Sequence, residues 1–183
     1  MPPKTVLTRE RIINGAIRVV RESGHESLTA RSVAGALECS TQPIYSVFGS
    51  IDALLDATVD RALEIALEHA LPSPDPESEF LGIGLAYLDF SRSEANLFQL
   101  LMTTGRERLS PSAAEWPFHR LAGQMRRDSV LAELSDERLQ ILLKNMFIYT
   151  HGLAALAPAQ PTAEDLENER ALLRDVGGRM IAL

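Results

Sequence analysis

The side chains best suited to bind DNA lie on a short predicted helix over residues 41–47. This helix turns three polar side chains outward, those of Thr41, Gln42 and Ser46, and carries Tyr45 beside them. Ile44 and Phe48 fall on the inner face, where apolar side chains would anchor the helix. Each base pair presents its own pattern of donors and acceptors in the major groove, and a glutamine can pair with adenine there. The spacing therefore predicts a helix that reads base edges in the DNA major groove.

Two short helices joined by a tight turn would hold these side chains in place. Thr29 is the expected N-cap of the first, which carries Val33, Ala34 and Leu37 at helical spacing. Ser40 is the expected N-cap of the second. Pro43 falls in the first turn of that helix, where a missing N–H costs little. The pattern is that of a helix-turn-helix.

Longer predicted helices flank this pair. A first helix over residues 8–23 buries an apolar stripe and ends before Gly24, a residue suited to the position after a helix. A fourth starts near Ser50 and stops at the proline-rich segment 71–76. Further helices are expected at roughly 77–92, 94–104, 111–128, 135–157 and 162–182. Because every periodic segment is helical, the fold class expected is all-α.

Residues 8–55 resemble the N-terminal DNA-binding domain of the TetR family of bacterial transcription regulators. The matching features form an ordered, gap-free set: Glu22-Ser23-Gly24, Leu28-Thr29, Val33-Ala34, Ser40, Ile44-Tyr45, Phe48 and Leu54. Two positions depart from the family pattern. Glu38 stands where the family usually has a glycine in the turn, and Ile51 stands where it usually has a lysine that contacts a DNA phosphate.

The resemblance implies a three-helix helix-turn-helix domain over residues 1–50 and a helical ligand-binding and dimerisation domain over 51–183. It implies these DNA-binding residues: Thr29, Arg31, Ser40, Thr41, Gln42, Pro43, Tyr45 and Ser46. Alternatives remain open for three of them. Tyr45 can instead pack against Phe48, Gln42 can be merely solvated, and Thr29 can act only as a helix cap.

The charge distribution is compatible with DNA contact through this segment alone. Residues 1–55 contain six Lys or Arg and five Asp or Glu, a net charge of +1, within a chain whose total is −7. The remainder therefore carries −8, which disfavours nonspecific binding of nucleic acid. The single cysteine, Cys39, excludes an internal disulfide. No stretch approaches the ~18 apolar residues of a membrane span, so we expect a soluble, cytoplasmic protein.

The C-terminal part concentrates aromatic and sulfur-containing side chains, which predicts a cavity for a small apolar or amphipathic molecule. The candidate lining residues are Tyr87, Phe90, Phe98, Met102, Trp116, His119, Met125, Phe147 and His151. An ordinary helical core is the alternative for each of them. For His151, on an apolar helix, a structural histidine is the alternative.

The C-terminal part also resembles a subset of TetR regulators with a His-Gly step ("WHG"-like), through residues 85–107 and 146–156. A homodimer is expected through the last two long helices. The candidate interface residues are Leu142, Met146, Leu153, Leu172, Val176 and Met180. Packed across a two-fold axis, these helices would make a four-helix interface.

Little in the sequence indicates an enzyme. Gly82 and Gly84 do not complete a dinucleotide-binding motif, and the four histidines are too scattered for a metal site. We therefore expect no catalytic residue, metal or cofactor. The expected function is transcription regulation, most often repression in such families, with double-stranded DNA bearing an inverted repeat and an unidentified small molecule as partners. The alternative is a helical dimer of the same fold that binds a small molecule and has weak or lost DNA binding.

Overall fold

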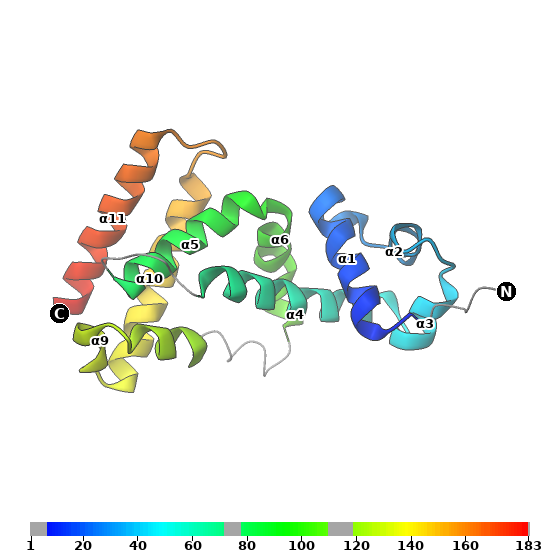
Figure 1. Cartoon of the computed structure of the whole chain (residues 1–183), viewed down its shortest axis with the longest axis horizontal. Coiled ribbons are helices and arrows are strands. Elements are labelled where there is room, and N and C mark those ends of the chain that lie inside the picture. Colours follow the sequence, from blue (N-terminus) through cyan, green and yellow to red (C-terminus); the bar gives the residue numbers. More distant parts are fainter. Residues whose placement is uncertain (1–6, 72–77, 110–118, 183) are drawn as a thin grey trace. The chain divides into compact units, whose positions relative to one another are not determined.

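The computed structural model describes residues 7–71, 78–109 and 119–182, and all regular structure in these ranges is helical. Figure 1 shows the elements in chain order. They are α1 (Arg9–Ser23), η1 (His25–Ser27), α2 (Ala30–Ala36), α3 (Gln42–Phe48), α4 (Ile51–Ala70), α5 (Glu79–Ser93), α6 (Ala95–Leu100), the π-helical η2 (Leu101–Gly105), α7 (Arg106–Arg108), α9 (Ser129–Ala132), α10 (Asp136–Leu156) and α11 (Ala163–Ala182). Residues 119–125 are also helical. The all-α prediction is confirmed.

The chain divides into two compact units, which we call the head unit and the body unit. The head unit comprises residues 1–65 with 94–113, and the body unit comprises 66–93 with 114–183. Helix α4 belongs to the head unit up to Ile65 and to the body unit from Ala66. The compact units thus group α6, η2 and α7 with α1 rather than with α5. The expected domain division at residue 50 stays a prediction.

Helix α1 forms the centre of the head unit. Thr8 caps it by accepting a hydrogen bond from the Arg11 N–H at 3.2 Å. Its buried face carries Ile12, Ala16 and Val20, none of which exposes any surface. A Cβ added to Gly15 would approach Leu37 at 2.9 Å, so this glycine permits close packing against the end of α2. The predicted apolar stripe is the one that packs the domain.

Polar contacts hold the segment 94–109 to α1 and α4 within the head unit. Arg108 donates to Asp56 at 2.9 Å and to Asp52 at 3.0 Å, and these hydrogen bonds raise the pKa of the guanidinium. The Arg21 guanidinium pairs with Glu94 at 2.7 Å. These ion pairs fix the segment against the two helices.

In the body unit, α10 packs against α5 and α11, and α11 packs against α5. Their common core contains Phe80, Leu81, Leu88, Met125, Leu131, Leu139, Leu142, Leu143, Met146 and Leu173. Gly177 of α11 lies so close to α5 that an added Cβ would meet the Phe80 ring at 3.3 Å. None of the helices described is long and apolar enough to cross a membrane.

Two local expectations are corrected. Helix α3 begins at Gln42 with Thr41 as its N-cap, one residue later than expected, so Ser40 is not the cap. The helix expected over 111–128 lies partly outside the described residues. Its described part ends at residue 125, and a separate short helix, α9, follows with Asp128 as its N-cap. The Asp128 side chain accepts from the Val130 N–H at 2.9 Å, and this bond starts a new helix.

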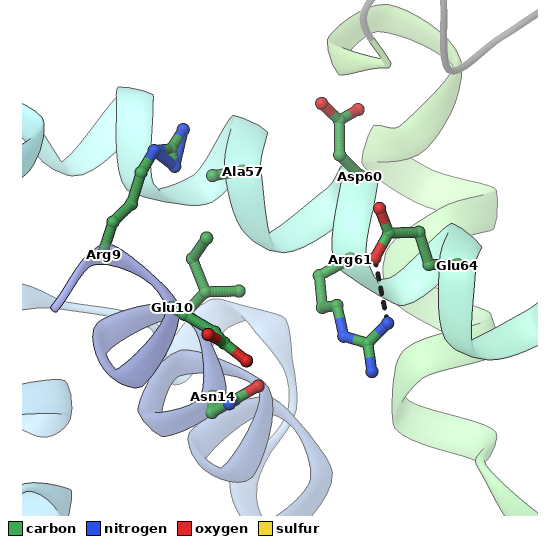
Figure 2. Close-up of a pocket in the computed structure, with 8 residues that line it drawn as sticks. Arg9, Glu10, Asn14, Ala57, Asp60, Arg61 and Glu64 are labelled. Atoms are coloured by element: carbon green, nitrogen blue, oxygen red, sulfur yellow. Dashed lines mark hydrogen bonds and ion pairs between the residues drawn. The ribbon is translucent and has the colours of Figure 1, made fainter.

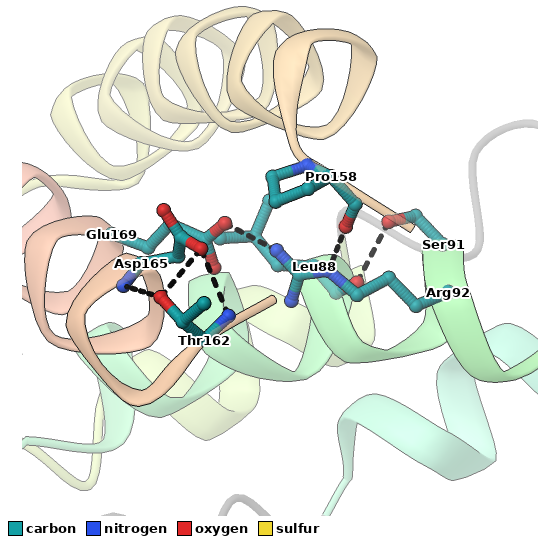
Figure 3. A network of polar contacts seen from close by, with 7 residues as sticks. All are labelled: Leu88, Ser91, Arg92, Pro158, Thr162, Asp165 and Glu169. Carbon is teal, nitrogen blue, oxygen red and sulfur yellow. Dashed lines mark hydrogen bonds and ion pairs between the residues drawn. The ribbon is translucent and has the colours of Figure 1, made fainter. Parts of the chain in front are cut away.

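A nearly buried ion pair joins α5 to α11 beside the turn that precedes α11 (Figure 3). The side chains of Arg92 and Glu169 are only 13% and 10% exposed, and Arg92 also donates to the Pro158 carbonyl at 3.3 Å. In the same turn, Thr162 and Asp165 form a capping box, with N···O distances of 2.8 and 3.2 Å. The hydrogen bonds from the Thr162 hydroxyl and N–H lower the pKa of Asp165.

Replacing Glu169 by glutamine removes the charge that compensates the buried Arg92. We expect the free energy of unfolding to fall by about 3 kcal/mol, because an uncompensated buried charge is costly. Asp175→Asn is the matched control, since its pair with Arg179 is exposed on both sides and should contribute no more than about 0.5 kcal/mol. Urea unfolding of the three proteins measures this difference. Equal losses for the two variants would contradict the assignment.

Candidate nucleic-acid interface

Helix α2 is started by a reciprocal capping box. The Ser32 N–H donates to the Thr29 hydroxyl at 3.0 Å, and the Thr29 N–H donates to the Ser32 hydroxyl at 2.9 Å. The predicted capping role of Thr29 is confirmed. Its side chain remains exposed, as does that of Arg31, the second residue of α2. Both can therefore reach a ligand outside the protein.

The turn between α2 and α3 requires a left-handed residue. The Leu37 N–H closes α2 by donating to Val33 at 3.0 Å, and the Cys39 N–H turns back to Ala34 at 3.0 Å. Between them Glu38 has φ of 54°, the only positive φ of a non-glycine residue in the described part of the chain. Most side chains avoid this conformation because Cβ crowds the backbone, whereas glycine adopts it freely.

Helix α3 separates an anchored face from an exposed one. Ile44 is fully buried, while Gln42 and Ser46 are exposed and the Tyr45 side chain is 49% exposed. Gly49 ends the helix with φ of 75°. The arrangement presents amide, hydroxyl and phenol groups on one short helix, as the sequence predicts. Thr41 and Pro43, in its first turn, are half-buried.

Two residues that the sequence did not single out complete this surface. Val47 is exposed on α3, where a branched apolar side chain can contact the methyl group of thymine. The Arg9 guanidinium lies 4.7 Å from the centre of the Phe48 ring, a cation–π contact that holds the end of α3 to the start of α1. No periodicity signal could have revealed this contact, because it joins two distant segments.

Arg9 also borders a charged hollow of about 620 Å³ between α1 and α4 (Figure 2). Its other lining residues include three acids, Glu10, Asp60 and Glu64, and a second arginine, Arg61, which pairs with Glu64 at 2.9 Å. The charges on its walls nearly balance. Ile51, at the first position of α4, is half-buried.

In the body unit, three of the predicted pocket residues come together. Tyr87 of α5 and Phe147 of α10 line a cavity, and the Tyr87 hydroxyl lies 3.1 Å from Nδ1 of His151. The remaining candidates lie elsewhere. Phe90 is buried beside His69, Met125 is fully buried in the core, and His119 is exposed.

Phe98 and Met102 belong to the head unit, so the structure does not bring them to this cavity. Trp116 lies outside the described residues.

The dimer-interface candidates also separate into two groups. Leu142 and Met146 are buried in the core of their own chain, so their side chains do not face outward. Leu153, Val176 and Met180 are partly buried against the same core, and Leu172 is exposed. Helix α10 presents a different apolar row to the outside, formed by Ile141, Ile148 and Leu156.

The arrangement of helices has close counterparts among solved structures. A possible TetR family transcriptional regulator from Streptomyces coelicolor matches with a TM-score of 0.60 and 17% identity, over 96% of this chain and 97% of its own. The chain has the TetR-family fold. A TetR variant from Acinetobacter baumannii AYE in complex with minocycline matches with a TM-score of 0.58 and 21% identity, over 96% of this chain and 95% of its own. Apo ActR from Streptomyces coelicolor matches with a TM-score of 0.58 and 19% identity, over 97% of this chain and 94% of its own. No family profile and no curated protein sequence matches the chain.

Within this TetR-like fold, Glu38 is the residue whose type conflicts with its backbone. Glu38→Gly should raise the free energy of unfolding by about 1 kcal/mol, because glycine adopts the left-handed conformation without strain. This value is the net gain, since glycine also increases the conformational entropy of the unfolded chain. Glu38→Gln is the matched control, because it removes the charge and keeps Cβ, and should leave stability nearly unchanged. Thermal and urea unfolding check both. Equal stabilisation by the two variants would attribute the effect to charge instead of strain.

Proposed function

We propose that this protein is a TetR-type transcription regulator without catalytic activity. It binds double-stranded DNA as a homodimer through α2 and α3, and it acts as a repressor that a small apolar or amphipathic molecule releases. The observation that carries the proposal is the build of α3. Its seven residues bury Ile44 completely and expose Gln42, Tyr45 and Ser46 together on one surface.

The exposed groups match the two tasks of a DNA-binding helix. Gln42 is assigned to a base edge, because its amide can donate and accept at an adenine. Tyr45, Thr29 and Arg31 are assigned to phosphates, which position the protein without reading sequence. Ser40, Thr41, Pro43 and Ser46 complete the proposed contact surface. Arg31 suits phosphate because it is exposed and has no ion-pair partner within the described residues.

A second copy of the chain would cover the outer faces of α10 and α11. On α10, Ile148 is 61% exposed and Leu156 is 86% exposed, and both fall on the same helical face as Ile141. Gly152 lies on this face too, and a Cβ built there meets nothing within 4 Å. Together with Leu172 of α11, these residues supply the apolar surface that a four-helix dimer interface requires.

A second candidate function is a TetR-fold dimer that binds a small molecule and has weak or lost DNA binding. Glu38 and Ile51 favour it, since the first adds a negative charge at the α2–α3 turn and the second replaces a residue that neutralises phosphate in the family. The neighbour in complex with minocycline is one TetR-fold protein that binds a small molecule. DNA binding distinguishes the two functions.

A homodimer with two α3 helices should protect DNA symmetrically. We expect footprinting on the DNA flanking the protein's own gene to show two protected half-sites related by a dyad, because the operator mirrors the symmetry of the protein. Sedimentation should show a dimer at micromolar concentration. A protected region without a dyad, or a monomer, contradicts the homodimer proposal, and the absence of any protection favours the second function.

The two assigned roles on α3 predict different losses. Gln42→Ala should weaken operator binding by about 1–3 kcal/mol and relax the preference at one base position. Tyr45→Phe should weaken binding to operator and random DNA equally, since a phosphate contact carries no sequence information. Gln160→Ala, in an exposed loop, is the control. Unchanged affinity in both α3 variants, with intact folds, would refute this placement of the recognition surface.

A further inference from the structure

The body unit contains a small apolar cavity that the DNA-binding surface does not use. Its volume is about 100 Å³, and it lies among α5, α10 and the helical residues 119–125. The walls are formed by core side chains that include Phe80, Leu143 and Met146. Apolar cavities of this order bind single rings the size of benzene when they can open slightly. The available space therefore limits the buried part of a ligand to one ring or a short branched chain.

None of the described residues that line this cavity is charged. A carboxylate, phosphate or ammonium group placed there would lose its hydration without gaining an opposite charge. The free-energy cost of this loss is far larger than the favourable free energy of burying a ring. Burial also raises the pKa of the Tyr87 phenol above its ordinary value, so this group stays neutral. The described walls of the cavity consequently disfavour charged groups of either sign.

A second hydroxyl group, besides the Tyr87 phenol, lines the cavity. Thr150 of α10 lines the cavity, and only 4% of its surface is exposed. The other buried threonine in the described chain with a comparable position in a helix, Thr58, donates to the Leu54 carbonyl one turn back at 2.7 Å. A threonine hydroxyl can both donate and accept a hydrogen bond, so the Thr150 hydroxyl on the cavity wall is available to a polar group of a ligand.

Two of the rings that line the cavity, those of Tyr87 and Phe147, also contact the ring of His151. Tyr87 and Phe147 meet edge to face with centroids 5.7 Å apart, and the Phe147 and His151 rings stack at 6.1 Å. Phe147 is about half exposed, so one side of the cavity reaches the surface through an aromatic side chain. Aromatic faces and edges favour a planar, unsaturated ligand over a saturated one of equal size.

The geometry points to this cavity as a binding site for a neutral, single-ring aromatic molecule whose one polar group hydrogen-bonds to the Thr150 hydroxyl. The inference deepens the proposed function, on which it rests only for the role of such a molecule as the effector. It names the class of ligand: uncharged, mostly apolar, with one hydroxyl or amide group attached to the ring or one atom away from it.

Four nearly isosteric probes test the charge and hydrogen-bond requirements at pH 7: benzyl alcohol, toluene, benzoate and benzylammonium. Binding to the full chain, without DNA, is followed by NMR of ¹³C-methyl methionine. Met146 lines this cavity and also the neighbouring hollow between α5 and α11, so its shift is assigned to the cavity by the Thr150 variants, whereas Met102 belongs to the head unit and serves as an internal control. We expect saturable shifts at Met146 with benzyl alcohol and toluene, and at least tenfold weaker binding of the two charged probes.

Thr150→Val removes the hydroxyl and preserves the shape of the side chain. It should abolish a preference of about fivefold for benzyl alcohol over toluene, while toluene binds unchanged. Thr150→Ser should retain the preference. Thr58→Val is the matched control, since it removes a buried hydroxyl in the head unit and should leave both affinities unaltered.

Charged probes that bind as tightly as benzyl alcohol would overturn the inference. So would a preference for the alcohol that survives Thr150→Val, or the absence of any saturable shift at Met146 with millimolar probe. Because no DNA is present, such a failure would leave the proposed DNA binding standing. Conversely, ring binding at Met146 in a protein that fails to protect DNA would sustain the inference and contradict the regulator function.

Discussion

The burial of Ile44 is the constraint on which the proposed DNA-binding surface depends. Helix α3 has seven residues, too few to be stable in water by itself, so its shape comes from packing. Ile44 provides this packing by burying its whole side chain. Gln42, Tyr45 and Ser46 face outward because Ile44 faces inward. A change in the packing of α1 or α2 would therefore reach the recognition surface directly.

Around this anchor, the head unit is held by polar contacts at its edges. Arg9 stacks on Phe48 at the end of α3, and Arg108 bridges Asp52 and Asp56 in the first turns of α4. Such partly exposed contacts contribute modestly to stability, but they set the orientation of the helices that they join. The unfavourable φ of Glu38 remains a local strain within this frame, and the surrounding packing maintains it.

The body unit combines a tightly paired contact with a packing gap. The nearly buried pair of Arg92 and Glu169 ties α5 to α11, while the cavity beside Tyr87 and Thr150 leaves part of α5 and α10 imperfectly packed. A ligand that fills such a gap adds contacts that are absent without it. Under the proposed function, ligand binding affects DNA binding only if the ligand has different affinities for the DNA-bound and the DNA-free conformation. The shape of this cavity must therefore differ between the two conformations.

Local signals in the sequence determined the helical class, the cap at Thr29 and the outward face of α3, because caps and periodicity act within one turn of helix. The exact start of α3, the left-handed Glu38 and the contact of Arg9 with Phe48 were decided by tertiary packing. Tertiary structure also decided which apolar residues of α10 face inward. Leu142 and Met146 look like an interface in the sequence, yet they are core residues, since periodicity identifies an apolar face but not what covers it.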